Sequence, residues 1–129
     1  MMNWQKILHW SKEELEDLRY VGYSYLQQGS YEIALTIFQA LIVVPPTLAY
    51  DLQTIGALYL QTNNNAEALH HLERALSMVP DHYPSLLNRA KALYALGHKR
   101  QAYLQSKELE NCVDPHIAKK AAALAISYQ

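Results

Sequence analysis

The sequence predicts an all-α fold in which pairs of helices repeat along the chain, and three observations support this prediction. Glycine and proline are scarce, at four and five residues in 129, so their positions are informative. Apolar side chains recur at spacings of three and four residues, which places them on one face of a helix. Residues of the same type also recur at one fixed interval of 34 positions. A fixed interval of this length indicates a repeated structural unit.

Four residue types share the interval of 34, which is hard to obtain by chance. The pairs are Gly22 and Gly56, Tyr25 and Tyr59, Ala34 and Ala68, and Pro46 and Pro80. Thirty-four residues is the length of a tetratricopeptide repeat (TPR), a helix-turn-helix unit. We therefore predict a TPR solenoid of three helix-turn-helix repeats, with a short N-terminal segment and a C-terminal capping helix. It forms a single domain over residues 1–129.

The first repeat is expected over residues 15–48. Ser11-Lys12-Glu13-Glu14 has the pattern of a capping box, so the first helix begins near Lys12, with Ser11 as its N-cap. Gly22 is small where the partner helix must approach closely. Gly29 ends the helix in a left-handed conformation. The second helix stops before Pro45-Pro46, because a proline disfavours helical backbone in the residue before it.

The second repeat is expected over residues 49–82, with Asn63-Asn64-Asn65 as its turn. The third, over residues 83–116, is looser, since Arg89 and Ser106 occupy positions that are normally apolar. A degenerate last repeat is expected where no further repeat covers it. A helix over about residues 117–129 then caps the solenoid.

Three features carry a more specific resemblance. They are the stretch Tyr-Glu-Ile-Ala-Leu-Thr-Ile-Phe-Gln-Ala-Leu at 31–41, the Ile55-Gly56-Ala57 segment, and the layout of three repeats plus a cap. From about Ser11 onward the chain resembles the LcrH/SycD family, the TPR-type (class II) chaperones of bacterial type III secretion systems. The resemblance implies a cytoplasmic bacterial protein, associated with virulence, that is not an enzyme. It implies binding of an extended segment of a secreted, translocator-like client in the concave groove, which keeps the client soluble and competent for export.

The first helix of each repeat lines the concave face of a TPR array. The predicted groove residues are Arg19, Tyr20, Tyr23, Leu26, Tyr50, Gln53, Ala57, Leu60, Leu87, Lys91 and Tyr94. This face is aromatic and aliphatic, with two cations and almost no acid, which suits an extended peptide with spaced apolar side chains. The resemblance places family groove positions on Arg19, Tyr23 and Leu26, where relatives tend to carry aromatic residues. The alternative is that several tyrosines only complete the packing between adjacent helices.

The N-terminal segment carries much apolar area in a short length, from Trp4, Ile7, Leu8 and Trp10. Such area is buried either against the first repeat or against a second copy of the chain. We expect the second, a self-association surface and a homodimer. The family often dimerises through this region, but the present chain is shorter there.

Two other partner classes can be compared with the sequence. TPR proteins that bind the acidic C-terminus of heat-shock chaperones use a clamp of five polar and cationic residues. The matching positions here are Arg19, Tyr23, Thr54, Pro84 and Asn88. Only Arg19 keeps a charge, so a carboxylate cannot be held bidentately. A TPR adaptor joining folded proteins and a chaperone of the needle subunit remain as alternatives.

The remaining features exclude several functions. A net charge of −1 gives no basic excess for nucleic acid. The apolar run ending at Val43-Val44 is far shorter than a membrane span. The single Cys112 excludes a multi-cysteine metal site, and His70 and His71 are adjacent on a helix, about 100° apart. No nucleophile elbow or glycine loop is present. We expect no cofactor, no metal and no catalytic residue.

Overall fold

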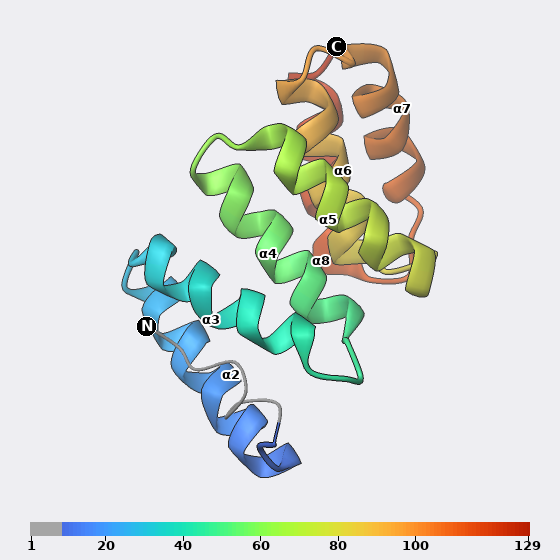
Figure 1. Cartoon of the computed structure of the whole chain (residues 1–129). Helices are drawn as coiled ribbons and strands as arrows, with labels where there is room; N and C mark the ends of the chain where they lie inside the picture. Colours follow the sequence, from blue (N-terminus) through green and yellow to red (C-terminus); the bar gives the residue numbers. More distant parts are fainter. Residues whose placement is uncertain (1–8) are drawn as a thin grey trace.

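The computed structural model describes residues 9–129, which contain seven helices and no strand. Figure 1 shows the helices in chain order, with α4 between the α2–α3 pair and the α6–α7 pair. Their bounds are α2 (Lys12–Gln27), α3 (Tyr31–Val43), α4 (Ala49–Gln61), α5 (Asn65–Met78), α6 (Tyr83–Ala95), α7 (Lys99–Leu109) and α8 (Pro115–Ser127).

The helices pack as three successive pairs, α2 with α3, α4 with α5 and α6 with α7, and α8 packs on α7 and α6. Each second helix also contacts the first helix of the next pair, α3 with α4 and α5 with α6. The first helices α4 and α6 contact each other directly. This is the arrangement of a TPR solenoid with a capping helix, and it confirms the predicted all-α fold.

The ends of the helices follow the local signals in the sequence. The Ser11 hydroxyl accepts a hydrogen bond from the Glu14 backbone N–H at 3.2 Å, and the Glu14 carboxylate accepts one from the Ser11 N–H at 3.1 Å. This is the predicted capping box. Gly29 ends α2 with a φ of 81°, and Asn63 forms the next turn with a φ of 61°. Both residues tolerate this left-handed conformation at lower cost than other side chains.

The capping helix begins earlier than predicted. The carboxylate of Asp114 accepts hydrogen bonds from the backbone N–H groups of His116 at 3.0 Å and Ile117 at 3.2 Å. Pro115 occupies the first helical position, where its missing N–H costs nothing. The helix starts at Pro115, two residues before the approximate bound of 117, because Pro115 opens this helix instead of closing the repeat before it.

Small residues allow the two helices of each pair to approach closely. A Cβ atom added at Gly22 would lie 2.8 Å from Cε2 of Phe38, and one at Gly56 would lie 2.6 Å from Cγ of Leu72. The equivalent position in the third repeat is Ala90, which is fully buried and carries a Cβ. The first two repeats are therefore packed more tightly at this position than the third.

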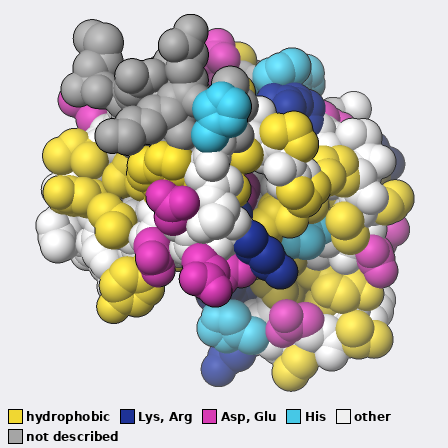
Figure 2. Space-filling view, turned by 60° about the horizontal axis from the view of Figure 1, so that its bottom comes forward, with side chains coloured by type: hydrophobic (Ala, Val, Ile, Leu, Met, Phe, Trp, Pro, Cys, Tyr) yellow, Lys and Arg dark blue, Asp and Glu magenta, His cyan; other side chains and the backbone are white. Residues whose placement is uncertain are grey.

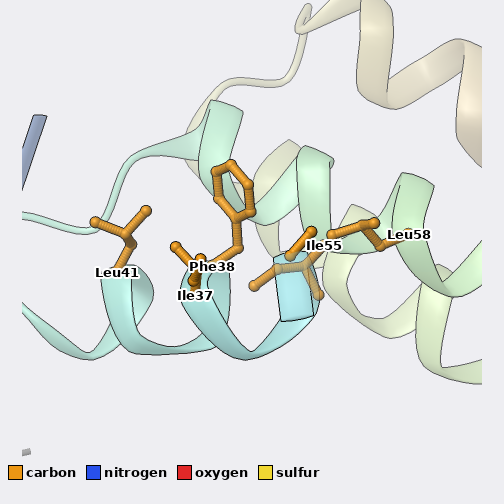
Figure 3. Close-up of a cluster of buried hydrophobic side chains, with 6 residues drawn as sticks. Ile37, Phe38, Leu41, Ile55 and Leu58 are labelled. Carbon is orange, nitrogen blue, oxygen red and sulfur yellow. The ribbon is translucent and has the colours of Figure 1, made fainter. Parts of the chain in front are cut away.

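The largest buried cluster joins the first and second repeats. Its side chains come from α3 and α4, and Figure 3 shows them beside one another, with five of them labelled. The labelled residues are Ile37, Phe38, Leu41, Ile55 and Leu58, and Ala34 completes the cluster; each is at most 4% exposed. This cluster fixes α4 against the first pair and thereby fixes the spacing of the first helices. Within residues 9–129, no helix is long and apolar enough to cross a membrane.

Candidate functional site: the groove between the first helices

A hollow of about 370 Å³ lies where the first helices of the three repeats meet. Its walls come from α2, the start of α3, α4 and α6. The lining residues are Leu26, Tyr31, Ala57, Leu58, Leu60, Gln61, Asn88 and Lys91. Four of them, Leu26, Ala57, Leu60 and Lys91, are predicted groove residues, and the structure brings these four together. The lining from α2 and α4 is apolar except for Gln61 at the end of α4, and the lining from α6 is polar.

Charged groups differ between the two ends of the array. On the face shown in Figure 2, hydrophobic side chains form several patches, and acidic and basic side chains lie beside a notch at its lower edge. At the α2 end, Arg19 donates from Nε and Nη2 to the two carboxylate oxygens of Asp51, at 2.9 and 2.7 Å. Asp51 is 1% exposed. The hydrogen bond to Asp51 raises the pKa of the Arg19 guanidinium above its ordinary value.

The sequence suggested that Arg19 is a free cation of the groove. In the structure it is paired with Asp51 instead. Its bidentate pair with Asp51 ties α2 to α4. It lies beside a second hollow, of about 430 Å³, on the side of α2 that faces the end of α3. Asp51 was missed as a partner, although it is the single acidic residue in the otherwise uncharged helix α4.

Lys91 lies at the other end of the groove, on α6. Partial desolvation lowers the pKa of its ammonium, and the positive charge of Lys120 on α8 lowers it further. The ion pairs among residues 9–129 are Arg19–Asp51, Arg89–Glu73 and Lys107–Glu110, so neither of these lysines is neutralised there.

Two groove tyrosines have structural contacts. The Tyr23 ring packs edge-on against Phe38 at 5.0 Å between centroids, and its hydroxyl lies 3.4 Å from Oγ1 of Thr54. Burial raises the pKa of the Tyr23 phenol. Tyr94 stacks on Tyr128 at 4.0 Å, with ring planes 7° apart. These contacts fit the alternative in which tyrosines complete the packing between helices.

Two predicted groove residues are buried in the structure. Leu87 is 4% exposed and packs with Leu109 and Ile117, because α8 covers this part of α6. Gln53 is 8% exposed inside α4. Neither offers a side chain to a ligand in this structure, and the expectation for both is corrected on that ground. Tyr20 is 75% exposed and Tyr50 is 51% exposed, but neither lines the hollow.

Of the predicted self-association residues, the structure describes Trp10. Trp4, Ile7 and Leu8 lie outside the described residues. Trp10 is half-buried and packs with Leu15 beside Ala40 and Val44. For Trp10, this contact corresponds to the alternative of packing on the first repeat.

Periodicity alone did not select four residues in or near the predicted groove. Tyr31, Gln61 and Asn88 line the hollow, and Tyr128 stacks on the predicted groove residue Tyr94. Tyr31 is at the start of a second helix, but the Nε2 of Gln61 donates to its hydroxyl at 3.1 Å and holds it over the groove. Tyr128 lies in the cap, whose register differs from that of the repeats. The starts of α4 and α6 are 34 residues apart, whereas those of α6 and α8 are 32 apart.

The groove, its helix pairs and its cap define the class of protein: a tetratricopeptide-repeat array. The tetratricopeptide repeat family matches residues 52–82 of the sequence. No curated protein matches the sequence of this chain.

The array is similar to solved structures of type III secretion proteins. PcrH from Pseudomonas aeruginosa is 22% identical, with a TM-score of 0.85 over 92% of this chain and 94% of that chain. PcrH in complex with the chaperone binding region of PopD gives 22% identity and a TM-score of 0.84, over 93% and 94%. The Yersinia enterocolitica type III secretion translocator chaperone SycD gives 20% and 0.80, over 91% of each chain.

A different kind of TPR protein is also similar. The first TPR of Spaghetti (RPAP3) bound to an HSP90 peptide is 18% identical, with a TM-score of 0.78 over 93% of this chain and 94% of that chain. At such identities the likeness describes the fold, and the function has to be argued from the residues of the groove.

Proposed function

We propose that this protein is a cytoplasmic bacterial chaperone of the type III secretion class, which binds an extended segment of a secreted client in the groove. The observation that carries the proposal is the hollow between α2, α4 and α6, lined by Leu26, Ala57 and Leu60. Its volume accommodates one large apolar side chain of a peptide lying across the first helices. The complex of PcrH with a region of PopD supports a peptide ligand on an array of this shape.

The groove binds by shape and apolar contact, without chemistry of its own. A client that exposes an apolar segment aggregates through that segment, and occupying it holds the client in solution by mass action. We expect the affinity for the client to be moderate, because the client must be released for export. No catalytic residue is assigned in this proposal.

The second candidate is a TPR adaptor for folded proteins or for acidic C-terminal peptides, which the likeness to the HSP90-binding array raises. The residues at the clamp positions argue against an adaptor that binds acidic C-terminal peptides. Arg19 is already paired with Asp51, and Thr54 is buried with its hydroxyl donating to the Tyr50 carbonyl at 2.9 Å. Neither residue is available to hold a terminal carboxylate.

The test is capture of clients from a bacterium with an active type III secretion system. The wild type is compared with Ala57→Glu, which places a charge in the hollow, and with Leu104→Glu, which places the same charge on an exposed position of α7. We expect one secreted protein to be recovered with the wild type and with Leu104→Glu, and to be lost with Ala57→Glu. Circular dichroism checks that all three are folded.

Recovery of the same partners with all three proteins would contradict binding in the hollow. Recovery of folded cytosolic proteins alone would favour the adaptor. The needle-subunit alternative is separated from the translocator class by the mass of the captured protein, because a needle subunit is a small protein.

A further inference from the structure

The groove has an unbalanced distribution of charge at its α6–α8 end. Helix α6 carries Arg89 and Lys91, helix α8 carries Lys119 and Lys120, and neither helix contains an aspartate or glutamate. Arg89 is satisfied by Glu73 on α5 and Gln105 on α7. Asp51, the single acid of α4, is occupied by Arg19.

Lys91 is the cation that lines the hollow itself. Asn88, one helical turn earlier on α6, lines it too and offers a neutral hydrogen-bonding group. Helix α8 packs against α6, and the positive charge of Lys120 on α8 acts on the Lys91 ammonium. Two like charges at one end of a groove repel each other, and an anion placed between them removes that repulsion.

We propose that the client segment carries an acidic side chain next to the apolar residue that enters the hollow, and that Lys91 and Lys120 bind this carboxylate. This inference rests on the proposed function and adds a rule for the ligand. An extended segment presents neighbouring side chains about 3.3 Å apart along its length. An apolar residue can therefore fill the Leu26–Leu60 side of the hollow while an acid within the next few residues reaches Lys91.

The lysines select among apolar segments in this arrangement. The apolar residue provides most of the contact area, and the charge pair provides discrimination against neutral or basic segments. Because both lysines are exposed, the pair is expected to change affinity by about fivefold and to weaken with salt.

The experiment is selection of peptides from a phage-displayed library of random twelve-residue sequences on the full chain. Three proteins are compared: the wild type, the double variant Lys91→Glu with Lys120→Glu, and the control Arg100→Glu. Arg100 is an exposed residue of α7 outside the hollow. We expect apolar peptides with a neighbouring aspartate or glutamate from the wild type and the control, and apolar peptides with lysine or arginine from the double variant.

A selected peptide is then resynthesised with its acid replaced by the amide, Asp→Asn or Glu→Gln. Fluorescence polarisation should show about fivefold weaker binding to the wild type at low salt, with a smaller difference at high salt. The neutral double variant Lys91→Gln with Lys120→Gln should bind the two peptides equally, and its folding is checked by circular dichroism.

The outcomes separate the two proposals. Apolar peptides selected without any acidic preference would overturn the charge rule and leave the chaperone groove standing. An acidic preference that persists in the double variant would also overturn it. Failure to select any peptide on the wild type would count against the peptide groove, and hence against the proposed function.

Discussion

The two ends of the groove use their cations differently. At the α2–α4 end, Arg19 is tied to a buried carboxylate and joins two helices. At the α6–α8 end, the like charge of Lys120 acts on Lys91, and neither helix contains an aspartate or glutamate. A positive residue on the concave face of a TPR array is therefore not by itself a ligand contact. Its role depends on whether the fold provides an acid within reach.

Packing differs between the same two regions. The first two repeats place Gly22 and Gly56 where the third places Ala90. The shared interval of 34 positions makes these three residues equivalent. The tight end of the array also holds the buried ion pair, whereas the looser end holds the unpaired charge.

Arg19→Ala should lower the free energy of unfolding by about 3 kcal/mol, because it leaves the Asp51 carboxylate buried without its partner. Lys91→Ala should change it by less than about 0.5 kcal/mol, because Lys91 has no acid to lose. Urea denaturation followed by circular dichroism measures both. The double variant Arg19→Ala with Asp51→Asn should recover part of the loss. Equal losses from Arg19→Ala and Lys91→Ala would break the distinction between the two ends.

Gly56→Ala should destabilise the protein by about 1–2 kcal/mol. The added methyl group meets the branching carbon of Leu72, and the strain exceeds the gain in helix propensity of up to about 1 kcal/mol. At the equivalent Ala90, the reverse change to glycine should also destabilise, by about 1 kcal/mol, since α6 loses propensity there. Thermal unfolding monitors both. A stabilising Gly56→Ala would show that the first repeats are not packed more tightly than the third.

Replacing His82, the N-cap residue of α6 in the third repeat, should give the smallest change in stability. Burial lowers the pKa of its imidazole below the ordinary 6.5, and Nδ1 lies 2.6 Å from the Ser85 hydroxyl at the start of α6. The folded state therefore favours the neutral ring, and this contribution is complete above about pH 6.5 and is lost as the pH falls below it. Stability should fall between pH 7 and pH 5 more steeply in the wild type than in His82→Gln.

The measurement is the free energy of unfolding at a series of pH values for both proteins. Their difference isolates the histidine, because the remaining titrating groups are shared. Parallel curves would mean that His82 titrates alike in the folded and unfolded states.

Much of the fold could be predicted because its signals are local. The capping box at Ser11 and the left-handed turns at Gly29 and Asn63 each depend on a few neighbouring residues. The interval of 34 is a repetition of residue types that can be read directly from the sequence. These features placed the repeat helices and identified four of the residues that line the hollow.

The errors arose where distant elements decide the outcome. Arg19 meets Asp51 across 32 positions, which no periodic pattern reveals. Leu87 has the position of a groove residue, but it packs with Ile117 of α8, which covers it. Helix α8 starts 32 residues after α6 instead of 34, so the cap does not follow the repeat interval. Asp51 was the available signal, because an acid at a buried position of an apolar helix demands a cationic partner.

The stacked rings of Tyr94 and Tyr128 join a residue of α6 to the end of α8 at 4.0 Å and nearly parallel. Two phenol chromophores held this close in a fixed orientation couple in the near ultraviolet, so the protein contains its own optical reporter. Loss of the coupled signal, with the helical signal unchanged, would register separation of the capping helix from the third repeat without any added label.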